Sequence, residues 1–161
     1  MSKVIVVTSG KGGVGKTTST ASLGVALAQG GRRVCVVDFD VGLRNLDLVV
    51  GAERRVVFDF INVAQGDAKL PQALIRDKRI DTLYLLAASP TRDKDALTPE
   101  GVELVIGELR ETFDSALCAS PACIGRRAPL AIRPAQQSIL VPYPAGALSR
   151  HPPRTLRVRP T

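Results

Sequence analysis

The stretch TSGKGGVGKTTS, residues 8–19, combines glycines, lysines and hydroxyl side chains at a spacing that suits phosphate binding. Gly10, Gly15, Lys16 and Thr17 match the phosphate-loop pattern G-x4-G-K-[ST]. In such a loop the backbone N–H groups point at the phosphates, the lysine reaches the β- and γ-phosphate oxygens, and the threonine hydroxyl is offered to Mg²⁺. The competing interpretation is a glycine-rich turn without a ligand, and a strand before the loop with a helix after it would argue against that interpretation.

The pattern therefore predicts a site for the phosphates of a nucleotide together with Mg²⁺. The residues expected to contact the nucleotide are Gly10, Lys11, Gly12, Gly13, Val14, Gly15, Lys16, Thr17 and Thr18. Lys11 is one lysine more than such a loop needs, because Lys16 and the backbone amides already serve its phosphates. Taken alone, Lys11 would be an exposed residue that balances local charge.

Two aspartates end the apolar run RRVCVVDFD, residues 32–40. Asp38 and Asp40 are two residues apart, which places both on one face of a strand. Carboxylates at the carboxyl end of a parallel strand face the crevice where ligands bind. They can hold Mg²⁺ through water or orient an attacking water, so the expected metal site consists of Thr17, Asp38 and Asp40. The alternative is that the pair caps a turn before Gly42.

The elements that position these residues follow from the apolar pattern. Continuous runs rich in β-branched residues predict strands buried on both faces, over residues 3–9, 32–40 and 81–89. Helical spacing predicts helices from Lys16 to the stop at Gly30-Gly31, and over residues 55–66, 70–75 and 98–113. The alternation of strands and helices predicts an α/β fold with a P-loop NTPase-type parallel sheet flanked by helices on both faces.

The segment after Phe113 differs from the rest in composition. Residues 115–161 contain seven basic residues, all Arg, and no acid, so the net charge of +7 resides there. Eight of the 11 prolines also follow Phe113, which forbids a long helix and any central strand apart from short pieces. We therefore expect residues 1–113 to form the N-terminal part of the domain. Residues 114–161 are expected to be an aberrant, irregular Arg/Pro-rich tail that leaves the sheet incomplete.

The composition also indicates where the protein is located and which classes of partner it has. Three cysteines without a CxxC pair indicate a reduced, cytoplasmic protein. Neither a secretory signal nor an apolar run of about 18 residues is visible, so any membrane contact is expected to be peripheral. Because the excess charge lies in the tail and not on a folded basic face, no nucleic-acid partner is expected.

The loop GKGGVGKT resembles the deviant P-loop of the MinD/ParA ATPases. The resemblance implies that Lys11 crosses a nucleotide-sandwiched homodimer and contacts the phosphates of the partner subunit, where it stabilises charge that develops in the transition state. It also aligns Asp40 with the aspartate of the family's switch I. The implied catalytic residues are Lys11, Lys16 and Asp40, with Asp38 in a supporting Mg²⁺ or structural role.

Four further segments resemble the MinD branch, the septum-site-determining ATPases of bacterial division: residues 38–51, 53–68, 72–78 and 88–102. This implies a peripheral protein that cycles to the inner face of the cell membrane as an ATP-dependent dimer, recruits a MinC-like inhibitor and is released by a MinE-like activator. Arg44, Asn45 and Glu53 are the implied partner contacts, unless they belong to ordinary solvated loops. A partition-type, ParA-like ATPase is the alternative, whereas the lack of paired cysteines disfavours the iron–sulfur carriers.

The resemblance weakens near the segment CASPAC, residues 118–123. Ala119 stands where the family has the aspartate that begins switch II, and Pro152-Pro153 interrupts the place of the membrane-binding helix. Either the reading frame shifts near codon 114, or this is a divergent short form whose arginines bind anionic lipid or nucleic acid. Three functions remain open at this point: an ATPase, a module that binds nucleotide without hydrolysis, and a fragment without activity.

Overall fold

Four buried strands form the centre of the protein in the computed structural model, which describes residues 2–9, 13–40, 45–89, 97–121 and 135–142. They are β1 (Lys3–Thr8), β2 (Val34–Asp38), β4 (Leu83–Leu86) and β5 (Ser115–Ala119). Within the described residues the sheet has six strands in the order β3-β4-β2-β5-β1-β6. Its edges are β3 (Leu74–Arg76), which is antiparallel to β4, and β6 (Gln137–Leu140), which is parallel to β1.

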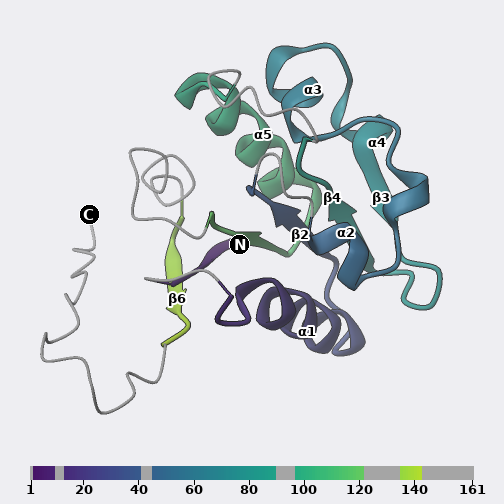
Figure 1. Cartoon of the computed structure of the whole chain (residues 1–161). Coiled ribbons are helices and arrows are strands. Elements are labelled where there is room, and N and C mark those ends of the chain that lie inside the picture. The colour runs from purple at the N-terminus through teal and green to yellow at the C-terminus, as the bar shows by residue number, and fades with distance from the viewer. Residues whose placement is uncertain (1, 10–12, 41–44, 90–96, 122–134, 143–161) are drawn as a thin grey trace, which may run out of the picture.

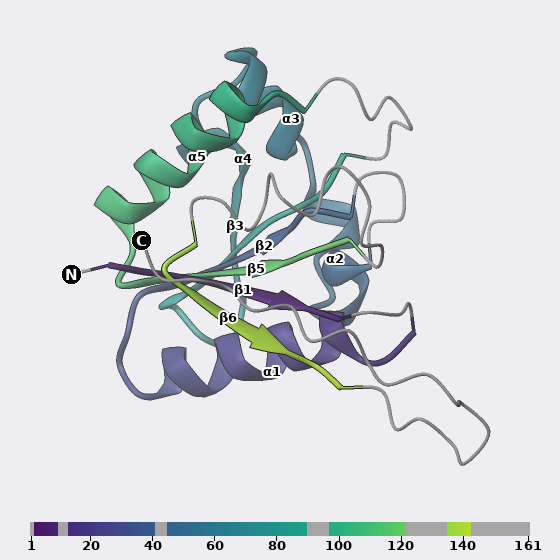
Figure 2. The same cartoon turned by 90° about the vertical axis from the view of Figure 1, so that its left-hand side faces the viewer.

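Helices cover both faces of this sheet, as Figures 1 and 2 show. α1 (Lys16–Gln29) and α2 (Leu46–Val49) lie on one face, where Leu46 packs with apolar residues of β2 and β4. α3 (Phe60–Gln65), α4 (Leu70–Ala73) and α5 (Pro99–Thr112) supply the core on the other face. The three-layer α/β prediction is confirmed, and the three predicted strands occur as β1, β2 and β4.

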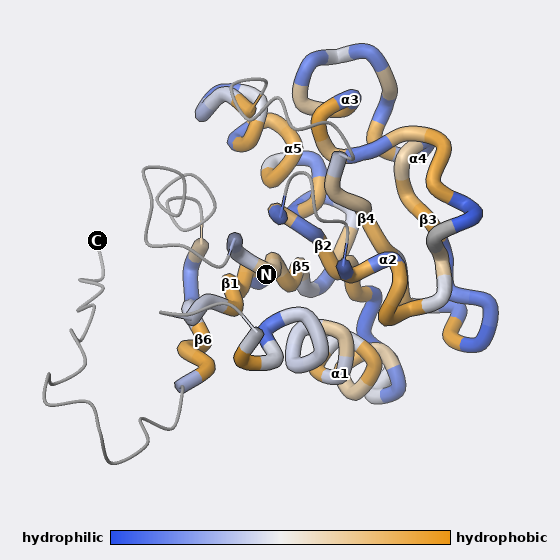
Figure 3. The backbone as a smooth tube through the Cα atoms, viewed as in Figure 1, coloured by the Kyte–Doolittle hydropathy of each residue, from blue (hydrophilic) through white to orange (hydrophobic). Residues whose placement is uncertain are grey.

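Continuous apolar runs form strands here because both faces of the sheet are covered. Every residue of β2 and β5 is buried, and Figure 3 shows these strands as largely hydrophobic. Successive side chains alternate between the two cores: Val36 of β2 contacts the α1 side, whereas Val37 contacts the α5 side. In α5, the N-cap Thr98 accepts a hydrogen bond from the N–H of Gly101, 3.1 Å away.

The helix predicted over residues 55–66 is too long. A 3₁₀ turn, η1 (Glu53–Arg55), comes first, and α3 begins only at Phe60. The helix begins there because the Asp59 side chain accepts hydrogen bonds from the backbone N–H groups of Ile61 and Asn62, at 2.8 and 3.1 Å. Val56 and Val57, which are β-branched, therefore remain outside the helix.

The helix predicted over residues 70–75 is also only partly correct. It ends at Ala73, and Leu74, Ile75 and Arg76 form the antiparallel edge strand β3. Pairing with β4 buries Ile75 against the α1-side core, which is a tertiary contact that overrides local helical spacing.

The sheet extends beyond the boundary expected at residue 113. β5 follows that boundary directly and lies between β1 and β2, and β6 lies beside β1. Two short strands of the segment expected to be irregular therefore belong to the sheet, as the exception for short pieces allowed, because the apolar run SALCA ends before the prolines begin. Residues 122–134 and 143–161 lie outside the described part of the chain.

Candidate nucleotide-binding site

Two of the predicted site residues that the structure describes lie at the carboxyl edge of the sheet: Asp38 ends β2, and Lys16 contacts Ser9 at the end of β1. Ala119 of β5 is the register partner of Val7 in β1 and of Asp38 in β2. Two further backbone bonds extend the ladders past the strand ends, from Ser120 N–H to the Val7 oxygen at 3.0 Å and from Phe39 N–H to the Ala119 oxygen at 3.1 Å. The carboxyl edge of the sheet is therefore rigid at the point where a ligand would approach.

The end of the phosphate loop has the backbone that anion binding requires. Gly13 and Gly15 have φ values of 73° and 92°, which residues with a Cβ adopt only with strain. Gly15 is the N-cap of the 14-residue helix α1 and provides no side-chain cap for the first helical N–H groups. A phosphate could therefore accept hydrogen bonds from these N–H groups and gain from the helix dipole.

Lys16 is the first residue of α1, and its side chain is enclosed. The residue is only 7% exposed, and its Nζ donates a hydrogen bond to the Ser9 hydroxyl, 2.9 Å away. Ser9 directly follows β1 and is also buried. Sequence reasoning missed this serine, because a hydroxyl residue beside a glycine loop has no distinctive spacing.

Asp38 supports the backbone in this structure. Its two carboxylate oxygens accept hydrogen bonds from the N–H groups of Asp40 at 2.9 Å and Leu46 at 3.1 Å. Burial raises the pKa of this carboxyl to about 6, although the two hydrogen bonds act in the opposite direction. Asp38 thereby ties the end of β2 to the start of α2, as expected of a structural role.

The residues that fit a Mg²⁺ ion best are Thr17 and Asp40, which are both partly exposed. Mg²⁺ is usually bound through one or two carboxylates together with substrate phosphates, so a complete protein cage is not needed. This agrees with the described residues, which contain no cluster of three or more His, Cys, Asp or Glu able to hold a metal. Asp38 fits less well as a direct ligand, since its oxygens already accept backbone hydrogen bonds.

The remaining predicted residues divide into two groups. Gly13, Val14, Gly15, Lys16, Thr17 and Thr18 lie together at the loop and the start of α1. Gly10, Lys11, Gly12 and Arg44 lie outside the described residues. Asn45 is exposed and precedes α2, and Glu53 begins η1, so these two expected partner contacts flank the same short helix.

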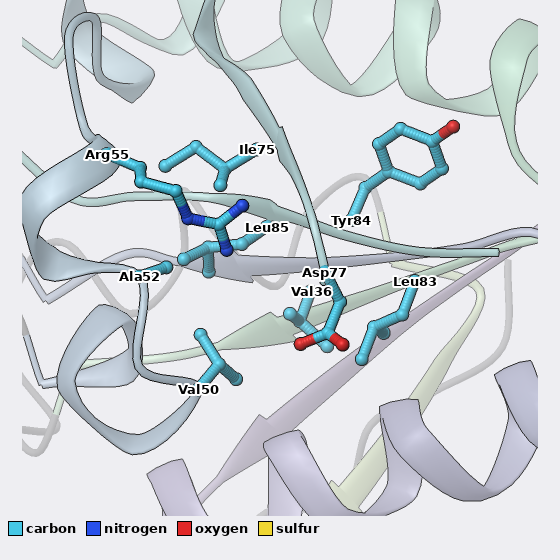
Figure 4. Close-up of a pocket in the computed structure, with 9 residues that line it drawn as sticks. All are labelled: Val36, Val50, Ala52, Arg55, Ile75, Asp77, Leu83, Tyr84 and Leu85. Atoms are coloured by element: carbon cyan, nitrogen blue, oxygen red, sulfur yellow. The ribbon is translucent and has the colours of Figure 1, made fainter. Parts of the chain in front are cut away.

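Arg55, at the end of η1, lines a narrow pocket beside β3 (Figure 4). Its Nη1 donates a hydrogen bond to the Arg76 carbonyl oxygen at 2.7 Å, which joins η1 to the edge strand. Its Nε is buried without a hydrogen-bond partner among the described residues. Asp77 points into the same pocket, but its Oδ1 already accepts hydrogen bonds from the backbone N–H groups of Arg79 and Ile80. The pocket is lined by none of the predicted nucleotide contacts.

Comparison with known proteins finds similarity over most of the chain. The profile described as the CobQ/CobB/MinD/ParA nucleotide binding domain matches residues 5–125. The septum site-determining protein MinD of Buchnera aphidicola is 56% identical over 159 residues, which cover 98% of this chain and 59% of that protein. Both matches extend beyond residue 113, further than the sequence motifs alone indicated. The chain thus spans about three fifths of the length of this relative.

Solved structures agree with the fold. MinD of Pyrococcus horikoshii, complexed with Mg-ADP, has a TM-score of 0.79 and 37% identity, covering 88% of this chain and 58% of that chain. MinD in a MinC:MinD complex of Aquifex aeolicus has a TM-score of 0.77 and 40% identity, covering 86% of this chain and 55% of that chain. In the described part of this chain no helix is long and apolar enough to cross a membrane.

Proposed function

Because the chain belongs to the CobQ/CobB/MinD/ParA nucleotide-binding domain family, we propose that it binds ATP with Mg²⁺ and hydrolyses it as a cell-division regulator of the MinD type. The observation that carries the proposal is the buried Lys16 at the start of α1, beside the carboxyl ends of β1, β5 and β2. A positive side chain, uncapped helical N–H groups and left-handed glycines meet there, which is the chemistry that a nucleotide's phosphates require.

Each residue of the site has a distinct task in this proposal. The N–H groups of the loop and of the first turn of α1 bind the phosphates, and Lys16 donates hydrogen bonds to the β- and γ-phosphate oxygens. Asp40 orients the attacking water from the end of β2, while Asp38 fixes the backbone on which Asp40 sits. Thr17 and Asp40 would hold Mg²⁺, and the ion would supply positive charge that neutralises the phosphates.

Dimerisation extends the proposal to Lys11. In an ATP-dependent homodimer, Lys11 of one subunit contacts the phosphates bound by the other and stabilises the transition state. A MinC-like inhibitor is the partner best supported, since a MinC:MinD complex has been solved for a related protein. Arg44, Asn45 and Glu53 are the proposed contacts. A MinE-like activator and the anionic inner face of the cell membrane complete the proposed cycle of this cytoplasmic, peripheral protein.

Ala119 favours a second candidate function, which is nucleotide binding without hydrolysis. P-loop NTPases usually hold Mg²⁺ with an aspartate at the end of a strand as well as the loop's hydroxyl. β5 lies next to β1, yet it ends at Ala119, which is 3% exposed, and buried Ser120 follows it. In this candidate the chain binds MgATP and dimerises without turnover.

Phosphate release by the purified chain distinguishes the two candidates. Turnover above background that disappears in Lys16→Ala and Lys11→Ala supports the ATPase. Binding without turnover supports the second candidate, and Ala119→Asp should then raise turnover, because it supplies the missing carboxylate. Light scattering with MgATP and with MgADP tests the dimer, which should form only with MgATP. Lys78→Ala, an exposed lysine on the far edge of the sheet, is the matched control.

A further inference from the structure

We propose that Ser9 is a positioning residue of the nucleotide site, whose hydroxyl holds the Lys16 ammonium and orients it toward the β- and γ-phosphates. The inference rests on the proposed nucleotide binding and deepens it. It is carried by one contact, in which Lys16 Nζ lies 2.9 Å from Ser9 Oγ with both residues buried.

The contact closes the loop at its base. Ser9 is the first residue after β1 and Lys16 is the first residue of α1, so the bond joins the two ends of the loop across seven positions. Ser9 is held firmly, because the preceding strand pairs with β5 on one side and β6 on the other. The long lysine side chain is flexible by itself, so the rigid serine reduces the conformational freedom that nucleotide binding would otherwise remove.

The numbers of donors and acceptors also match. A lysine ammonium has three N–H donors and no acceptor. One donor is bound by Ser9 Oγ, which, as far as the described residues go, leaves two for phosphate oxygens. Burying an ammonium is unfavourable unless it is hydrogen-bonded, so Ser9 also stabilises Lys16 in the enclosed position before a nucleotide arrives. Alanine at position 9 would fill similar space but could not accept the hydrogen bond.

Calorimetric titration of the full chain with MgATP, MgADP and AMP tests this role. Ser9→Ala should lower the affinity of the chain for MgATP and for MgADP about tenfold, because hydrogen bonds to charged groups are stronger than those between neutral groups. AMP affinity should not change, because AMP lacks the phosphates that Lys16 contacts. Ser9→Thr keeps the hydroxyl and should bind within about twofold of the parent. Ser22→Ala, at an exposed hydroxyl on α1, is the control and should bind all three nucleotides normally.

A double-mutant cycle with Lys16→Met separates positioning from general stability. Ser9→Ala should add no further loss of MgADP affinity in the Lys16→Met chain, and urea unfolding without nucleotide should show that the two substitutions are coupled. The proposal would be overturned if Ser9→Ala bound MgADP within twofold of the parent. It would also be overturned if the substitution lowered the affinity for AMP as much as the affinity for MgADP. If the parent binds no nucleotide although the unfolding cycle shows coupling, the proposed function fails, and Ser9 has only a structural bond to Lys16.

Discussion

Gly24 lies inside α1 and faces the sheet where no room remains for a side chain. A Cβ at this position would lie 2.5 Å from Val36 Cγ1 and 3.5 Å from a δ-carbon of each of Leu83 and Leu117. Carbon atoms in contact are ordinarily about 3.5–4.0 Å apart. Val36 cannot rotate away at low cost, because β-branched side chains are stiff at χ1. Gly24→Ala should therefore push α1 away from β2.

The expected size of this effect follows from two opposing contributions. Alanine in a helix interior is favoured over glycine by about 0.5–1 kcal/mol. Overpacking of a close-packed core costs about 1–3 kcal/mol. The free energy of unfolding should therefore fall by up to about 2.5 kcal/mol, which corresponds to a midpoint lowered by up to roughly 10 °C in a domain of this size. Since α1 begins at Lys16, MgADP affinity should also decrease.

Urea unfolding followed by circular dichroism measures this effect. Gly107→Ala is the matched control, because Gly107 lies in α5 and a Cβ there meets nothing within 4 Å. It should raise stability by about 0.5–1 kcal/mol. The combined variant Gly24→Ala/Val36→Ala should lose less stability than the sum of the losses of the two single variants, because the new methyl group occupies the space that Val36 vacates. The reasoning is refuted if Gly24→Ala stabilises the protein as much as Gly107→Ala does.

Three substitutions test other parts of the account. Asp38→Asn removes a carboxyl that keeps its proton in the folded state up to a pKa of about 6, above the ordinary 3.8. The stability of the parent relative to this variant should therefore be greatest below pH 4 and fall by up to about 3 kcal/mol as the pH rises from about 4 through 6; a constant difference in urea titrations across this range would contradict the argument. Asp59→Ala removes the N-cap of α3 and should cost about 1 kcal/mol in urea unfolding, most of which Asp59→Ser restores; equal stability of all three chains would show that the cap is unimportant. Phe60→Ala removes a buried ring whose centroid lies 4.6 Å from that of Phe39 and should cost about 3–5 kcal/mol, whereas Val57→Ala at a 79% exposed side chain should cost little; similar losses for both would argue against the described core.

The sequence predicts most of this fold because its signals are local. The buried strands β1, β2 and β4 are continuous apolar runs, and the phosphate loop is a fixed spacing between a strand and a helix. β3 was missed because Leu74–Arg76 is three residues long, and only its pairing with β4 makes it a strand. β5 was missed because the prolines and arginines that follow it dominate the composition of its segment.

The site shows the same difference between local and long-range information. Lys16, Thr17 and the loop glycines can be read from one motif, and Asp40 from its place after a strand. The engagement of Asp38 with two backbone N–H groups depends on how the chain returns to it at Leu46, which spacing does not reveal. The Ser9–Lys16 contact likewise exists only once the loop has folded back between β1 and α1. The role of Lys11 in a dimer stays a prediction.

Calorimetric titration of the full chain with MgATP, alongside the Lys16→Ala variant, shows whether the loop binds a nucleotide. We expect saturable binding of a single nucleotide per chain, which is lost in Lys16→Ala while urea unfolding shows that this variant remains folded. A parent chain that unfolds cooperatively in urea yet binds neither MgATP nor MgADP at millimolar concentration would show that the loop is not a nucleotide site.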